Sequence, residues 1–91
     1  MLYAWMGFLK PDADPISQAI QQQGVDFLSQ PIIKIHSEGP LRDATGKRAG
    51  MLMIFEVADW EAAQSFVRDS PFLKAGLYED YRLYEYDDEV G

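Results

Sequence analysis

The chain contains no cysteine and a single histidine, His36, among its 91 residues. The absence of cysteine excludes disulfides, thiolate nucleophiles and cysteine-based metal sites. One histidine with scattered carboxylates is also a poor transition-metal site, because such sites usually combine several His or Cys ligands. We therefore expect no metal and no cofactor, and a cytoplasmic location is compatible with the lack of cysteine.

Basic residues are also few, since eight Lys and Arg stand against fifteen Asp and Glu and give a formal net charge of −7. Nucleic acids and anionic membrane surfaces attract positively charged proteins, so neither is an expected partner. No apolar run approaches the ~20 residues that a transmembrane helix needs. The apolar residues 1–9 lack a basic leader and precede Lys10 and Pro11, which predicts a strand rather than a signal peptide.

Hydrophobic periodicity predicts one domain over residues 1–91 with the order β-α-β-β-α-β. The expected strands are residues 2–9, 32–38, 51–57 and 81–86, and residues 39–49 form a polar loop. The first helix is expected within residues 16–30, with Asp14 as its cap, and either breaks or becomes irregular at Gly24. The second follows Asp59 as its N-cap, and a short third one starts at Ser70 and stops at Gly76. The buried stripe expected on the second helix is Trp60, Ala63, Phe66 and Val67.

This order is the ferredoxin-like α+β arrangement, in which two helices cover one face of a four-stranded antiparallel sheet. Strands 2–9 and 51–57 are apolar on both faces, so the second face also needs cover. Burying even ~500 Å² of it is worth on the order of 10 kcal/mol by area. We therefore expect a homodimer with two sheets packed face to face. In strand 32–38, alternation puts Lys34, His36 and Glu38 on one face.

Two segments with glycine and proline at turn positions flank the third expected strand: residues 37–43, Ser-Glu-Gly-Pro-Leu-Arg-Asp, and residues 70–77, Ser-Pro-Phe-Leu-Lys-Ala-Gly-Leu. Together with residues 1–3 and 61–66, they resemble the YCII-related family in order and spacing. The resemblance implies a dimeric α+β barrel. It also implies a small-molecule site, because the family is similar to dehalogenase-like and muconolactone-isomerase-like proteins.

The family's catalytic pair is a His on the first helix and an Asp after the Gly-Pro segment. Asp43 matches the Asp, whereas the His position falls near Gln22. The family often has Ser after the glycine that opens the third strand, but here Met51 follows Gly50. Glutamine cannot shuttle a proton at neutral pH, so the inherited acid–base pair is incomplete.

His36 and Asp43 are the candidate catalytic residues, with His36 as a relocated acid or base that Asp43 orients. The alternative for His36 is a half-exposed strand histidine near a dimer interface. The alternative for Asp43 is a turn residue whose side chain binds the backbone of the loop. A small organic anion has four candidate contacts in and beside the loop: Arg42, Arg48, Gly39 and Pro40. The alternatives are a solvated loop for the two arginines and a structural turn for Gly39 and Pro40.

Aromatic residues either line a pocket for an aromatic substrate or form core and interface: Tyr3, Trp5, Phe8, Phe55, Tyr78, Tyr81, Tyr84 and Tyr86. Residues 78–81, Tyr-Glu-Asp-Tyr, place a phenol in a cleft near a strand start. The leading interpretation is a cytoplasmic, dimeric YCII-related protein, with a pocket between sheet and helix, that acts as a cofactor-independent lyase- or isomerase-type enzyme on a small organic acid. The alternative is a non-catalytic small-molecule-binding or assembly module, and the sequence does not decide whether the chain is an enzyme.

Overall fold

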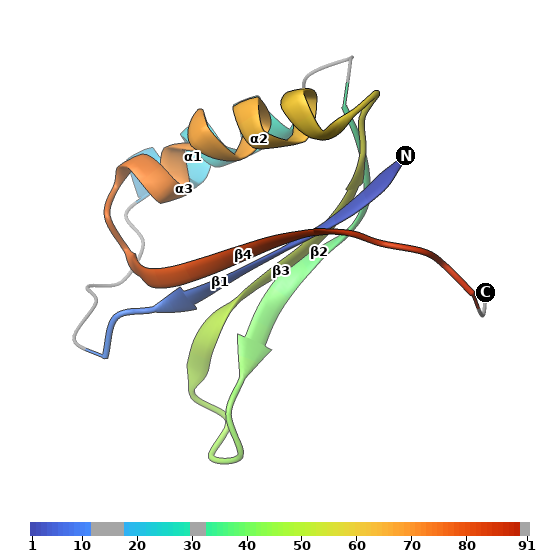
Figure 1. Cartoon of the computed structure of the whole chain (residues 1–91). Coiled ribbons are helices and arrows are strands. Elements are labelled where there is room, and N and C mark those ends of the chain that lie inside the picture. The colour runs from blue at the N-terminus through green and yellow to red at the C-terminus, as the bar shows by residue number, and fades with distance from the viewer. Residues whose placement is uncertain (12–17, 30–32, 90–91) are drawn as a thin grey trace.

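The computed structural model describes residues 1–11, 18–29 and 33–89, which form two layers (Figure 1). The sheet contains β1 (Leu2–Leu9), β2 (Lys34–Arg42), β3 (Arg48–Glu56) and β4 (Tyr78–Glu85). The helices are α1 (Gln18–Leu28), α2 (Trp60–Arg68) and α3 (Pro71–Lys74), and they lie together on one face of the sheet (Figure 1). All strand pairs are antiparallel and the strand order is β2-β3-β1-β4. The predicted ferredoxin-like α+β fold is confirmed.

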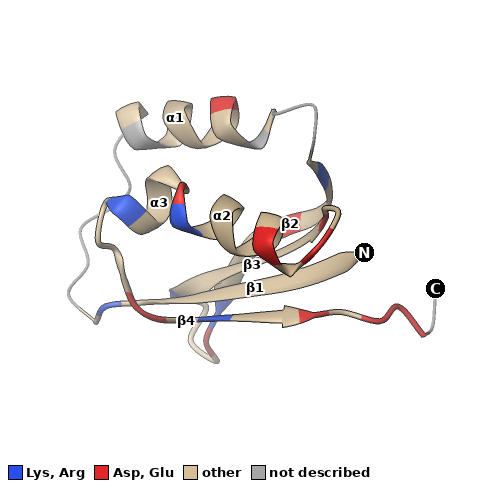
Figure 2. Ribbon diagram, turned by 45° about the horizontal axis from the view of Figure 1, so that its top comes forward, with Lys and Arg blue, Asp and Glu red and all other residues tan. Residues whose placement is uncertain are grey.

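The central strand β1 carries no charged residue (Figure 2) and pairs with both β3 and β4. Tyr3 and Trp5 point toward the helices and are 0% and 3% exposed. Successive strand residues point to opposite faces, so Met6 and Phe8 lie on the other side of the sheet, called the open face below. Within the described residues, no segment of the chain covers the open face (Figure 1).

The hairpin between β2 and β3 is longer than the sequence predicted. Residues 39–42 and 48–49, expected in a polar loop, belong to the two strands, and only residues 43–47 form the turn. The backbone N–H of Asp43 donates to the Lys47 carbonyl at 2.9 Å and closes this turn, in which Gly46 takes a φ of +85° that favours glycine. Pro40 fits within β2 because β2 is an edge strand.

The cap of α2 agrees with the prediction, because the Asp59 carboxylate accepts a 2.9 Å hydrogen bond from the N–H of Ala62. Ala63 and Phe66 are buried against the sheet as expected. Trp60 was predicted to belong to the same buried stripe, and this is wrong: its side chain is 40% exposed. It is the first residue of α2 and faces the edge strand β4, where no further element covers it in the described chain.

The first helix, α1, runs through Gly24 without a break, which corrects the predicted interruption. Gly24 is buried against the ring of Phe72 in α3, and a Cβ there would overlap that ring. The glycine is therefore a packing contact between two helices. The predicted cap at Asp14 lies outside the described residues.

Candidate functional site

Three β-bulges interrupt the sheet. The added residues are His36 in β2, Ala49 in β3 and Glu79 in β4, since at each point the pairing advances by two residues on that strand and by one on its neighbour. Because side chains alternate with a period of two, each added residue turns the following side chains to the opposite face.

The three bulges bring Glu38, Arg48 and Tyr78 to the helix-facing side of the sheet. Glu38 lies opposite the buried Met53 in the β2–β3 register, and Tyr78 is only 8% exposed. Uninterrupted alternation would have pointed all three side chains to the open face. The predicted grouping of His36 with Glu38 on one face is therefore wrong, because the bulge at His36 separates them.

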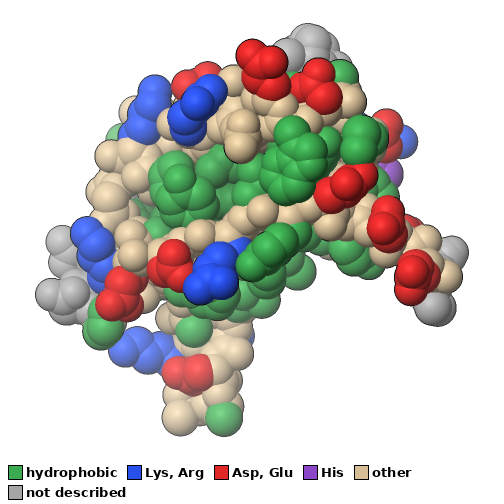
Figure 3. Space-filling view, in the orientation of Figure 1, with side chains coloured by type: hydrophobic (Ala, Val, Ile, Leu, Met, Phe, Trp, Pro, Cys, Tyr) green, Lys and Arg blue, Asp and Glu red, His purple; other side chains and the backbone are tan. Residues whose placement is uncertain are grey.

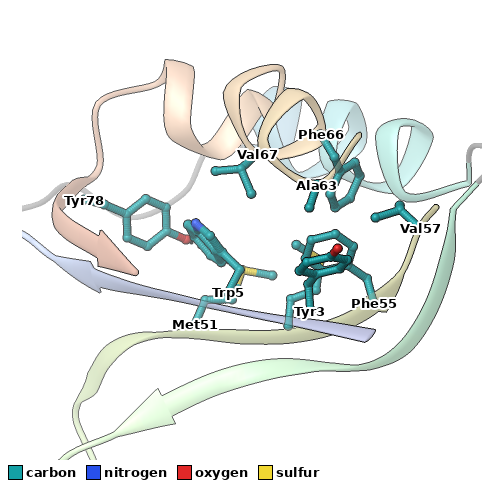
Figure 4. Close-up of a cluster of buried hydrophobic side chains, with 10 residues drawn as sticks. Tyr3, Trp5, Met51, Phe55, Val57, Ala63, Phe66, Val67 and Tyr78 are labelled. Carbon is teal, nitrogen blue, oxygen red and sulfur yellow. Dashed lines mark hydrogen bonds between the residues drawn. The ribbon is translucent and has the colours of Figure 1, made fainter. Parts of the chain in front are cut away.

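Tyr78 lies inside the molecule beside Trp5 and Met51 (Figure 4). Its ring meets the Trp5 ring edge-on, with 5.2 Å between ring centroids and 90° between planes. Its hydroxyl donates to the Met51 sulfur at 3.6 Å, a weak acceptor. Gly7 makes this packing possible, because a Cβ at Gly7 would collide with both rings. Tyr78 thus puts a phenol beside the position where the family often has a serine.

Two charged side chains act on this phenol. Burial raises the pKa of Tyr78, the positive charge of Arg48 opposes that rise and the negative charge of Glu38 adds to it. Both side chains therefore influence the phenol through space, without a hydrogen bond to it, since its hydroxyl donates to Met51. Within the described residues, neither Arg48 nor Glu38 forms an ion pair. We call Tyr78, Arg48, Glu38, Trp5 and Met51 the Tyr78 site.

The Tyr78 site also contains two buried hydrogen-bond donors without a partner in the described part of the chain, the indole Nε1 of Trp5 and the Nε of Arg48. Figure 4 shows the Trp5 nitrogen on the side of its ring that faces the helices. Buried donors almost always have a partner in the protein, in ordered water or in a ligand. Each of these two donors is therefore able to bind an oxygen atom.

A cavity of about 10 Å³ adjoins Trp5 and Met51 under the helices, which is room for about one water molecule. Apart from the indole nitrogen, its polar lining comes from Ser70, which is 8% exposed. Ser70 stands at the predicted N-cap position of α3, but its side chain makes no cap hydrogen bond. The cavity is therefore too small for an organic molecule, and Glu38 is the exposed side chain of the Tyr78 site.

The structure does not bring the predicted pair of His36 and Asp43 together. The six strand residues 37–42 lie between them, a separation of roughly 20 Å at the rise of a β-strand. The His36 Nε2 is 3.1 Å from the Glu56 Oε1 on β3. This contact, as the largest cause, holds the pKa of the Glu56 carboxyl below its ordinary value.

Asp43 organises the hairpin turn, the alternative considered from the sequence. Its Oδ1 accepts hydrogen bonds from the Thr45 hydroxyl at 2.6 Å, the Thr45 N–H at 2.9 Å and the Lys47 N–H at 3.1 Å. The bond from the Thr45 hydroxyl is the largest of the causes that lower the pKa of Asp43. Arg42 serves the same turn, because its Nη1 donates to the Gly46 carbonyl at 2.9 Å.

The remaining predicted positions are exposed or lie along the edge of the sheet. Gly39 and Pro40 pair with β3 inside the edge strand β2. Gln22, near the family's histidine position, is exposed on α1 and donates from Nε2 to the Asp26 carboxylate at 3.1 Å. Of the six predicted site residues, only Arg48 belongs to the Tyr78 site.

Sequence reasoning singled out the Tyr78 segment but missed Glu38 and Trp5 as members of one site. A signal existed for Trp5, an indole with a donor in an otherwise apolar strand. None existed for Glu38, because the bulge that turns it inward leaves no mark in the residue pattern. The described residues hold no cluster of three His, Asp or Glu side chains for a metal ion, and none of their helices has the length and apolarity to cross a bilayer.

The fold is similar to a solved enzyme, the 5-chloro-2-hydroxyhydroquinone dehydrochlorinase TftG from Burkholderia phenoliruptrix AC1100, in complex with 2,5-dihydroxybenzoquinone. The TM-score is 0.71 at 26% sequence identity, over 96% of this chain and 94% of that one. No curated protein matches the chain. The model of the YCII-related domain matches residues 1–87, and the chain therefore belongs to the YCII-related family.

Proposed function

We propose that this chain is a cofactor-independent enzyme that transfers protons on a small organic acid, in an elimination or isomerisation, at the Tyr78 site. The observation that carries the proposal is the convergence of Tyr78, Arg48 and Glu38 from three strands, each turned inward by its own bulge. Bulges are over-represented next to active sites, where they re-aim side chains. The similarity to a dehydrochlorinase supports small-molecule chemistry in this fold.

Each side chain has a definite part in this chemistry. Arg48 binds the carboxylate of the substrate, for which a guanidinium is suited. Glu38 accepts the proton that leaves carbon, and the Tyr78 phenol, kept protonated by burial, gives its proton to the departing group or to the isomerised product. Glu38 then releases its proton to water and the Tyr78 phenolate takes one proton back from water, which restores both groups.

Proton transfer is tested most directly by exchange of substrate C–H protons for deuterium in D₂O, followed by proton NMR. The panel consists of small 2-oxo, 3-oxo and unsaturated carboxylic acids, with 2,5-dihydroxybenzoquinone as a binding probe. Tyr78→Phe, Glu38→Gln and Arg48→Gln are expected to lower the exchange rate by about 100-fold each. The matched controls are Glu61→Gln and Arg42→Gln. Loss of exchange in Arg42→Gln but not in Arg48→Gln would refute the assignment.

The second candidate is a non-catalytic small-molecule-binding module. Gln22 and Met51 favour it, because they replace groups of the family with side chains that cannot transfer protons. Binding of a panel member without any proton exchange, retained in Glu38→Gln, decides for this alternative. The predicted acid–base role of His36 has a separate test: His36→Asn should leave exchange unchanged if the Tyr78 site is catalytic.

We also propose that the protein is a cytoplasmic homodimer joined through the open face. Phe8 and Tyr84 on that face are 40% and 49% exposed, and Met6 and Ile54 share the face with them on β1 and β3. Sedimentation velocity is expected to give a dimer at micromolar concentration and a monomer for Ile54→Glu. A monomeric parent protein contradicts the dimer, and cell fractionation tests the location.

A further inference from the structure

A groove of about 310 Å³ lies between α2 and the edge strand β4. Its lining residues are Trp60, Gln64, Val67, Arg68, Tyr81 and Leu83. Figure 3 shows hydrophobic side chains gathered in a hollow between the helices and β4. We propose that this groove binds a single planar aromatic ring that carries a carboxylate, with the ring between Trp60 and Tyr81 and the carboxylate on Arg68.

The two aromatic side chains of the groove are partly exposed, and each also packs against a buried ring. Trp60 and Tyr81 are 40% and 43% exposed. The Trp60 ring meets the buried Tyr3 ring at 5.1 Å and 71°, and the Tyr81 ring lies 6.4 Å from the buried Trp5 ring at 34°. Rings fixed in this way lose little conformational entropy when a ligand binds between them. They offer faces and edges to a third ring.

Arg68, the last residue of α2, supplies the charge. Its Nη2 donates to the Ser65 hydroxyl at 3.1 Å, which orients the guanidinium and leaves its other N–H groups for a ligand. It is the sole basic residue of α2, in a chain of net charge −7. A guanidinium binds a carboxylate through two parallel hydrogen bonds. Gln64 lies one turn earlier on the same helix face and adds an amide.

Groove size and lining select the ligand class. A volume of about 310 Å³ is at the lower end of small-molecule pockets, which favours one ring over a nucleotide-sized cofactor. Val67 and Leu83 line the groove between its polar groups. The groove is distinct from the Tyr78 site, because Tyr78, Arg48 and Glu38 do not line it.

The test is a titration of the full chain with 4-hydroxybenzoate, followed by ¹H–¹⁵N NMR of the Trp60 indole N–H and the amides of α2 and β4. We expect a Kd of roughly 0.1–1 mM. Benzyl alcohol lacks the carboxylate and acetate lacks the ring, so each should bind at least about tenfold more weakly. Arg68→Gln should weaken binding about tenfold, whereas the matched variant Lys74→Gln, which removes an exposed charge on α3, should change it by less than about twofold.

Trp60→Ala should also weaken binding, while Tyr78→Phe should leave groove binding unchanged, which separates this proposal from the proposed enzyme activity. Equal affinities for Arg68→Gln and Lys74→Gln would overturn the proposal, as would shifts confined to the Tyr78 site. Protein-concentration-dependent shifts of the groove amides without ligand, abolished by Trp60→Ala, would show a second copy of the chain as the occupant instead.

Discussion

The two ends of the layer between the sheet and the helices differ in one respect. At one end, called the Phe55 end, rings pack on rings: Phe27 and Phe66 stack at 4.7 Å, and Phe55 lies 4.8 Å from Phe66. At the other end, the Tyr78 site combines rings with a phenol, a guanidinium and an indole N–H. Two donors of this site, one on the guanidinium and one on the indole, have no partner in the described chain.

Both ends are comparably buried, so burial alone does not distinguish them. Phe55 is 0% exposed and Tyr78 is 8% exposed. When the chain folds, the apolar side chains at the Phe55 end lose only their contact with water. The donors without a partner at the Tyr78 site also lose their hydrogen bonds to water, which costs free energy. The first end stabilises the fold, and the second is retained at a cost in stability, which is typical of functional sites.

The largest expected effect comes from Phe55→Ala. Removing this fully buried ring leaves a cavity and should lower the free energy of unfolding by about 3–5 kcal/mol. Urea denaturation measures the change. The exposed Val25→Ala is the control and should change stability by less than about 0.5 kcal/mol. A loss below about 1 kcal/mol for Phe55→Ala would contradict the assignment of this end as the stabilising one.

Trp5→Phe should cost much less than its size suggests. The smaller ring makes fewer contacts, but the substitution also removes a buried donor without a partner. Such a donor lowers the stability of the folded state by about 1–3 kcal/mol. We expect a net loss of no more than about 1 kcal/mol in the same urea experiment. A loss above about 2 kcal/mol would show that the indole nitrogen contributes a hydrogen bond to stability, and the contrast between the two ends would disappear.

Tyr78→Phe tests the difference between the two ends through the stability of the protein at alkaline pH. Burial raises the pKa of this phenol, so the folded state favours its protonated form. That contribution to stability is present below the unfolded pKa of about 10 and is lost as pH rises through the folded value. The variant should therefore lose less stability than the parent protein between about pH 9 and 11, with a change at pH 7 within about 1 kcal/mol. Tyr81→Phe, whose ring is 43% exposed on the same strand, is the matched control, and identical alkaline curves for the parent protein and Tyr78→Phe would contradict the burial of Tyr78.

The smallest effect is expected at the exposed pair of His36 and Glu56. Their contact lowers the Glu56 pKa, so its contribution is present above the unfolded pKa of Glu and is lost as pH falls through the folded value. His36→Ala should make the stability curve shallower between about pH 5 and 3. Ser37→Ala, which leaves the contact in place, is the control. Equal acid slopes for parent and His36→Ala would mean that the contact has no energetic consequence.

Much of the fold was predictable because local signals and periodicity agree. The apolar strand before Lys10 and the cap at Asp59 were each visible in a few neighbouring residues, and both are present. The length of the hairpin strands was underestimated, because glycine and proline at positions 39 and 40 are as compatible with an edge strand as with a turn.

The candidate site was less predictable for a physical reason. Register depends on pairing between distant strands, and a bulge adds one residue without requiring any particular residue type. Alternation therefore placed Glu38 beside His36, and the strand length that separates His36 from Asp43 was hidden by the assumed loop. The partner of His36 is Glu56, twenty residues away in sequence, which no local pattern indicates.

The three bulges have a consequence for how such proteins diverge. Deleting Ala49 would turn the arginine before it to the open face while every other amino acid stayed the same, and inserting one residue into an uninterrupted strand would turn the side chains beyond it in the same way. A one-codon length change can thus move a charged group from one face of the sheet to the other, and a single-position gap in an alignment then carries more chemical information than a substitution.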